Sequence, residues 1–338
     1  MSSLASSIRT FSRPLDRRLV VAGLAIAAVL AAIVLAVGVG PVYIGPATVW
    51  KSLIGHAEGT SDVIVRQIRL PRVLVAAMVG ANLAMSGAIL QGVTRNPLAD
   101  PHVFGISAGA GVVAVAGLVF FPGLPFKYVE PMAFVGGVVS GGLAYTMAWR
   151  GGTTPARLAL AGIAVTSMLT AVIAAMLITS SFSAQIGLRW IIGGLLGRNW
   201  QDARLLFPYF AGGTVLALVM ARQLNVIALG DEIATGLGQR VERTRLALVG
   251  IAALLASSAV SIAGLIGFVG LIVPHFARLT VGNDYRFLVP ISALYGAILL
   301  IGADTAARTV LDPRELPVGV LTAVVGGPVF IYLVRKRA

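Results

Sequence analysis

The chain has 338 residues, of which 57% are hydrophobic and only 12% are Asp, Glu, Lys or Arg, and its mean hydropathy is +0.92. Soluble domains carry about 25% charged residues, so this composition excludes a soluble enzyme, a disordered chain and a secreted disulfide scaffold. The sequence contains no cysteine, which excludes thiolate metal sites and cysteine nucleophiles.

The net charge of +13 is spread along the chain rather than gathered in one basic patch. Lys and Arg stand singly or in pairs between apolar stretches, without the interleaved aromatic residues that bind single-stranded nucleic acid. This pattern is typical of loops beside membrane helices, and it excludes nucleic acid as a partner. More than half of the 26 basic residues fall on the side of the N-terminus, which favours both termini in the cytoplasm.

Ten apolar runs follow one another along the chain, and in lipid such runs form helices because a helix pairs all its own backbone groups. They cover residues 19–39, 70–93, 103–121, 130–149, 157–179, 203–221, 245–263, 265–279, 287–304 and 316–334. The first run is longer than the roughly 7–15 apolar residues of a signal peptide, so we expect it to be retained. The pattern predicts an all-α, polytopic membrane helical bundle of about ten transmembrane helices. It forms one domain over residues 1–338, with its helical core at 19–338.

Residues 95–102 interrupt the chain between the second and third runs. Their two prolines, and Asn96-Pro97 in particular, predict a turn followed by a new helix. A second Pro-His pair, Pro274-His275, occupies a similar place in the other half, and broken helices in corresponding places are typical of transporters. A water-channel half-helix would require a second Asn-Pro pair, which the sequence lacks.

Two sequence patterns are weak indications of an enzyme active site or a metal site. Residues 105–109 read Gly-Ile-Ser-Ala-Gly, the form of a nucleophile elbow with Ser107 as nucleophile, which would make the chain an intramembrane hydrolase. An elbow requires a preceding strand, and no strand pattern precedes this one. The three histidines, His56, His102 and His275, lack the spacing of metal ligands, so we expect no metal site.

Asp304 is an acid at the end of the ninth run, and an acid inside a membrane is a functional candidate. In that role Asp304 would carry the coupling ion of a secondary transporter, a class of protein that is driven by an ion gradient rather than by ATP. Arg308 lies one helical turn further on. We favour an ion pair between the two residues, because pairing lowers the cost of placing both charges in the membrane.

Residues 224–240 are too few and too polar to cross the membrane. Asp231 and Glu232 after Gly230 indicate the acidic first turn of a short helix, and Gly236 and Gly238 end it. Such a helix either caps a loop or forms a docking surface on the cytoplasmic face. The chain has no Gly-Lys-Ser or Gly-Lys-Thr phosphate-binding loop, so ATP would be bound by another subunit.

Taken together, these motifs closely resemble permease subunits of the type II ABC importers for iron–siderophore chelates, haem and cobalamin. The resemblance extends over nearly the whole chain from Arg69 onward. The motifs that carry it are Arg69-Leu70-Pro71-Arg72, residues 80–92, 96–101, 105–110, 229–234 and 267–275, Leu316-Pro317-Val318-Gly319 and residues 326–330.

The resemblance implies a second permease subunit, identical or paralogous, and two cytoplasmic ATPase subunits that carry ATP and Mg²⁺. It also implies a substrate-binding protein, periplasmic or lipid-anchored, and a multi-pass location in the inner or plasma membrane, in contact with its lipid. No cofactor or metal would be bound directly. The residues that match the family's ATPase-coupling helix are Leu229, Gly230, Asp231, Glu232, Ala234, Gly236 and Gly238.

The resemblance further implies that Arg69, Arg72 and Arg308 lie at the periplasmic rim and pair with acidic residues of the binding protein. Arginine suits this role because its planar fork binds a carboxylate with two hydrogen bonds. The alternative is that these arginines reach lipid headgroups. Residues 101–107 look more like siderophore members, so an iron(III)–siderophore is the expected substrate, and haem or cobalamin is the alternative.

Overall fold

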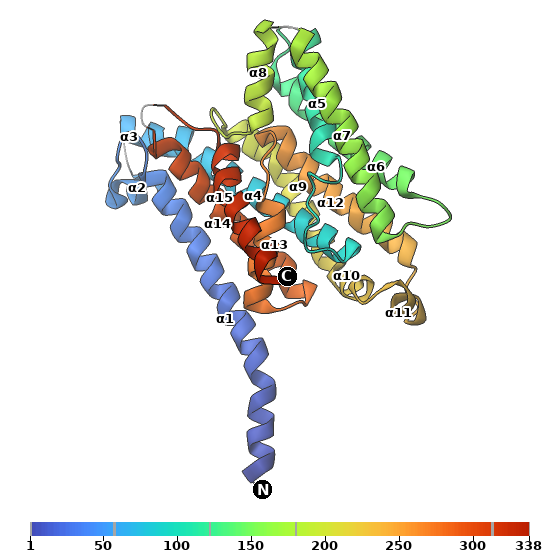
Figure 1. Cartoon of the computed structure of the whole chain (residues 1–338). Coiled ribbons are helices and arrows are strands. Elements are labelled where there is room, and N and C mark those ends of the chain that lie inside the picture. Colours follow the sequence, from blue (N-terminus) through green and yellow to red (C-terminus); the bar gives the residue numbers. More distant parts are fainter. Residues whose placement is uncertain (1, 57–58, 122, 180, 312–313, 338) are drawn as a thin grey trace.

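The computed structural model describes residues 2–56, 59–121, 123–179, 181–311 and 314–337, and every regular element in these ranges is a helix. The first half contains α1 (Ser2–Gly38), α2 (Pro46–Leu53), α3 (Thr60–Val63), the π-helix η1 (Ile64–Arg69), α4 (Leu70–Thr94), α5 (Ile106–Phe120), α6 (Phe126–Ala148) and α7 (Pro155–Thr179). The second half contains α8 (Ser181–Ile192), α9 (Trp200–Val219), α10 (Ala221–Ala228), α11 (Asp231–Gly236), α12 (Val241–Ala263), α13 (Val269–Val281), α14 (Tyr285–Thr309) and α15 (Val318–Arg337). Figure 1 shows α10 and α11 toward the N-terminal end of the bundle, with α2, α3 and α8 at the opposite end.

Among the described residues, seven helical segments are long and apolar enough to cross a membrane. They are Arg17–Gly38, Thr60–Thr94, Phe126–Ala148, Pro155–Ile178, Trp200–Val219, Val241–Ala263 and Tyr285–Thr309. Three shorter apolar helices, α5, α13 and α15, occupy the positions of the remaining predicted runs. The predicted all-helical membrane bundle is therefore confirmed, whereas the structure identifies seven full-length spans rather than ten.

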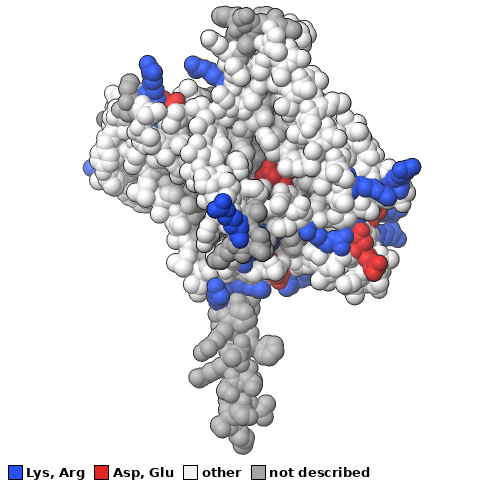
Figure 2. Space-filling model, in the orientation of Figure 1, with Lys and Arg blue, Asp and Glu red and all other residues white. Residues whose placement is uncertain are grey.

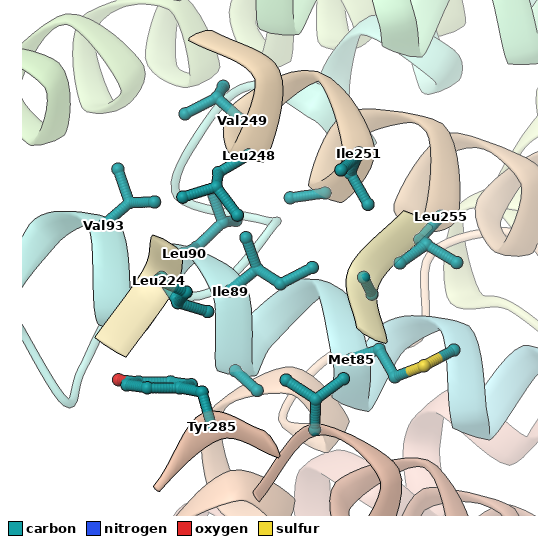
Figure 3. Packing of buried hydrophobic residues seen from close by; sticks show 14 of the residues in the cluster. Met85, Ile89, Leu90, Val93, Leu224, Leu248, Val249, Ile251, Leu255 and Tyr285 are labelled. Carbon is teal, nitrogen blue, oxygen red and sulfur yellow. The ribbon is translucent and has the colours of Figure 1, made fainter. Parts of the chain in front are cut away.

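Helix α4 is the centre of the bundle and the most buried of the long apolar helices, with 89% of its most apolar window inside the protein. It packs against α9, α12, α13 and α14. Figure 3 shows part of this core, where Ile89 and Leu90 of α4 lie beside Leu248 of α12. Leu224 of α10 and Tyr285 of α14 join the same cluster. The short helix α10 is thus attached to the core.

Glycines allow the backbones around α4 to approach each other closely. A Cβ added to Gly80 would lie 2.1 Å from the carbonyl oxygen of Gly296 in α14, and one added to Gly87 would lie 1.9 Å from that of Gly270 in α13. Both distances are below van der Waals contact, so neither position has room for a side chain. Small residues let membrane helices pack in this way without a hydrophobic driving force between them.

The predicted break after the second run is confirmed. Residues 95–105 connect α4 to α5 without a helix, between left-handed φ angles of +52° at Arg95 and +76° at Gly105. Within this connection the Asp100 carboxylate accepts a hydrogen bond from the His102 N–H at 2.8 Å, and burial raises the pKa of Asp100. This hydrogen bond closes a local turn within the connection.

One helix begins later than predicted, and one helix was not predicted. The eighth run was expected to begin at residue 265, but α13 begins at Val269. Gly264 and Phe268 have φ angles of +70° and +69°, and this left-handed backbone cannot continue a helix. Helix α8 was not predicted, because its mixed sequence around Arg189 is neither long nor uniformly apolar.

Candidate functional site

The segment 224–240 forms the short helix that its acidic residues indicated. Gly230 precedes α11 with a φ of +119°, a conformation that glycine adopts without strain. Asp231 and Glu232 occupy the first turn, where the helix dipole favours negative charge. Helix α11 ends at Gly236, and Gly238 turns the chain with a φ of +79°.

One side of this segment is held in the core, and the other is open. Leu224, Ile227 and Ala234 are fully buried. Leu229, Ile233 and Leu237 point outward, with exposed fractions of 59%, 53% and 66%. Figure 2 shows acidic and basic side chains gathered at this end of the molecule. Exposed apolar side chains surrounded by charge are typical of a protein-docking surface.

An ion pair fixes α11 to α12. The Asp231 carboxylate lies 2.7 Å from Nη2 of Arg245, and Nη2 of Arg95 at the end of α4 lies 3.5 Å from the same oxygen. Arg245 is 1% exposed, whereas Asp231 is 36% exposed at its side chain. A buried guanidinium needs several partners to offset its desolvation. The position of α11 is therefore tied to a charge inside the bundle.

The same guanidinium continues the network to the α6–α7 connection. Nη1 of Arg245 donates to the backbone carbonyl of Thr153 and lies 3.4 Å from Glu242. The Glu242 carboxylate accepts hydrogen bonds from the hydroxyls of Thr153 and Tyr145. A continuous polar chain thus runs from α11 through α12 to both ends of the α6–α7 connection. Sequence reasoning missed it, and the i,i+3 spacing of Glu242 and Arg245 was the one local signal.

A cavity of about 590 Å³ lies beside α10, between the end of α4 and the start of α14. Asp284 lines it and accepts hydrogen bonds from Arg286 and from the Asn225 amide of α10, the latter at 2.7 Å. The hydrogen bond from Arg286 lowers the pKa of Asp284 to about 2. The ionised carboxylate also caps α14, which gives α10 a second attachment.

At the opposite end, Arg69 is buried within its own chain. Its guanidinium donates to the backbone carbonyls of Val37 and Gly38, both at 3.0 Å, and to that of Val42 at 2.6 Å. The side chain therefore closes the loop that follows α1.

Arg72, Asp304 and Arg308 form a buried cluster at this rim, and the partly exposed Glu315 joins it. Asp304 lies 2.8 Å from Nη2 of Arg72 and 3.2 Å from Nε of Arg308, so the predicted i,i+4 pair is confirmed and a second arginine joins it. Nη1 of Arg72 lies 2.9 Å from Glu315, whose side chain is 26% exposed. Arg69, Arg72 and Arg308 are 5%, 7% and 4% exposed. All three guanidinium groups are thus held by groups of their own chain. Their direct contact with a binding protein stays a prediction.

The patterns for enzyme or metal chemistry gain no support. Ser107 is buried in the first turn of α5, and within the described ranges no strand precedes it, so the geometry of an elbow is missing. In the same part of the chain no group of three or more His, Asp or Glu side chains could hold a metal ion. Asp304 is paired with two arginines, Arg72 and Arg308.

Comparison with known proteins finds one family model and a set of close relatives. The model of the FecCD transport family matches residues 18–336. A permease protein of the Fe(3+)-citrate import system of Bacillus subtilis is 44% identical over 81% of this chain and 82% of its own length. A cobalamin import permease of Halobacterium salinarum is 45% identical over 82% of this chain and 75% of its own.

A solved structure shares the fold over nearly the whole chain. It is described as a metal-chelate type ABC transporter in an inward-facing conformation. It superposes with a TM-score of 0.85 and 27% identity, covering 93% of this chain and 98% of the other.

Proposed function

The chain belongs to the FecCD transport family, and we propose that it is the permease subunit of an ATP-driven ABC importer for an iron(III)–siderophore-type chelate. The observation that carries the proposal is the exposed apolar face of residues 229–237, which α10 anchors to the core of a membrane bundle whose sequence has no ATP-binding loop. The relatives named above are permeases of iron-citrate and cobalamin import systems, which supports transport of a metal chelate.

In this function, α10–α11 docks into an ATPase subunit on the cytoplasmic face. Leu229, Ile233 and Leu237 supply the exposed apolar contact, and Glu232 supplies charge at its edge. Closure of the ATPase dimer around ATP and Mg²⁺ moves α11. The pair between Asp231 and Arg245 transmits that movement to α12 and to the α6–α7 connection.

We place ten crossings in the membrane, made by the seven long apolar helices together with α5, α13 and α15. An even number puts both termini on one side. The excess of Lys and Arg on the N-terminal side makes that side cytoplasmic. A second copy or a paralogue completes the transport pathway, which faces alternately outward and inward and breaks no bond in the substrate.

The rim that carries Arg69, Arg72 and Arg308 then faces the periplasm or cell exterior and receives the substrate-binding protein. Arg72 is the arginine best placed for direct contact, because its partner Glu315 is partly exposed and a carboxylate of the binding protein can replace it. Glu315→Gln should therefore strengthen docking several-fold, measured as the Kd of the binding protein for the reconstituted permease. An unchanged Kd would remove Arg72 as a direct contact.

The preference for a siderophore rests on residues 101–107, whose sequence Pro-His-Val-Phe-Gly-Ile-Ser resembles siderophore permeases. Haem and cobalamin are the alternatives. They are distinguished by offering each chelate to the same reconstituted system.

The decisive experiment reconstitutes the permease in liposomes with its ATPase and binding protein. We expect uptake of the ⁵⁵Fe-labelled chelate to require ATP, the ATPase and the binding protein together. Uptake driven by a proton gradient without ATP would overturn the proposal and restore the secondary transporter that uses Asp304.

A further inference from the structure

An apolar groove of about 790 Å³ lies between α1, α4, α9 and α14. Along its depth it is lined by apolar side chains, among them Val29, Met78, Phe207 and Ala297. Its polar lining residues, Gln67, Trp200 and Arg204, belong to η1 and to the first turns of α9, both at the rim. The groove is therefore apolar inside and polar at one end.

The length of the groove matches one leaflet of a bilayer. Along α9 its lining runs from Trp200 to Phe210, and the ten residue steps between them, at a rise of 1.5 Å each, span about 15 Å. The hydrocarbon core of a bilayer is about 30 Å thick, so one leaflet contributes about half of that. A lipid acyl chain with its headgroup at the rim fits this depth.

The charge at the polar end has no partner among the residues that the structure describes. Arg204 is exposed, and over the described residues it makes no hydrogen bond or ion pair. The neighbouring arginines differ, because Arg198 is paired with Glu130 and Asp202, and Arg72 with Asp304 and Glu315. The described acids beside these two arginines are thus already paired, which leaves an anion from outside the chain as the partner for Arg204.

The indole of Trp200 marks the depth of the membrane interface. Its Nε1 donates to the backbone carbonyl of Arg66 at 2.8 Å, which fixes the ring at the mouth of the groove. Tryptophan with a satisfied N–H and an apolar body is enriched where acyl chains meet headgroups.

We propose that this groove binds an anionic phospholipid, with one acyl chain between α1, α4, α9 and α14 and its phosphate at Arg204. A second copy of this chain is the other occupant to test. It fits less well, because a chain with 26 Lys and Arg against 13 Asp and Glu has few acids to offer Arg204.

The test uses the full chain, purified in a mild detergent and titrated with dioleoyl-phosphatidylglycerol in native mass spectrometry. We expect Arg204→Gln to weaken phosphatidylglycerol binding about fivefold, the effect of one basic residue on an anionic headgroup. Lys127→Gln, which removes a charge at the same rim but outside the groove, should leave binding unchanged. Phosphatidylcholine should bind equally to all three proteins, and free glycerol phosphate should not compete.

A second variant tests the apolar half of the groove. Ala77→Phe fills it at a half-buried position and should reduce binding of both lipids. Equal phosphatidylglycerol binding by the wild type and both groove variants would overturn the proposal. So would a shift of Ala77→Phe from dimer to monomer without loss of lipid, because the groove would then be a subunit interface. Neither result depends on the transported substrate.

Discussion

Replacing Arg245 should separate ATP hydrolysis from transport. In Arg245→Gln the link between α11 and the interior of α12 is lost, while the amide can still donate to the Thr153 carbonyl. A hydrogen bond to a charged group contributes about 1.5–3 kcal/mol. Because the Asp231 side chain is 36% exposed and water replaces part of the contact, we use about 1.5 kcal/mol. That value corresponds to roughly a tenfold increase in the detached population of α11.

The assay compares ATP hydrolysis and chelate uptake in the same proteoliposomes. We expect Arg245→Gln to retain hydrolysis and to lose about tenfold in chelate transported per ATP. Arg243→Gln is the matched control, because it removes a cation from the exposed face of the same helix and should transport normally. Since the chain has no cysteine, introduced cysteine pairs can also report the distance between α11 and α12.

Normal coupling in Arg245→Gln would refute the reasoning. If that variant fails to fold, Asp231→Asn removes the same link from its exposed side. A folded Asp231→Asn protein with wild-type transport per ATP would refute it equally.

Three further predictions test the other contacts. The double variant Glu232→Arg with Gly236→Trp should keep its fold but lose ATP-dependent uptake, because both changes lie on the exposed face of α11; unchanged uptake would remove the docking assignment. Gly87→Ala should destabilise the protein by about 1–3 kcal/mol, because the added methyl group would overpack against α13. Gly250→Ala is the control, because no atom lies within 4 Å of the added Cβ, and it should leave stability unchanged. Thermal unfolding in detergent measures both variants. Asp284→Asn keeps an N-cap acceptor but removes the carboxylate charge that pairs with Arg286 and with the helix dipole, so it should lower stability by about 0.5–1 kcal/mol at neutral pH. Because the folded pKa of Asp284 is about 2, its contribution is full above about pH 4 and lost as the pH falls toward 2, so the two proteins should converge there; a constant difference would contradict it.

Features that depend on neighbours along the chain could be predicted from the sequence. Length and hydropathy located the apolar helices, since a helix in lipid is a local solution to backbone pairing. The acidic residues after Gly230 identified α11, and the spacing of Asp304 and Arg308 identified their ion pair. Each of these contacts joins residues within about one helical turn.

Features that join distant segments were decided by the tertiary structure alone. Arg72 meets Asp304 across 232 positions, and Arg245 meets Thr153 across 92, so no local pattern contains either contact. The motif that identified the three rim arginines could not indicate that their guanidinium groups are buried. A charge in a membrane protein lies inside or outside according to the partners that packing brings to it, because only those partners offset its desolvation. The sequence alone thus determined which residue types are present and how they are spaced. The packing of the helices determined which charged side chains are buried and with which residues they pair.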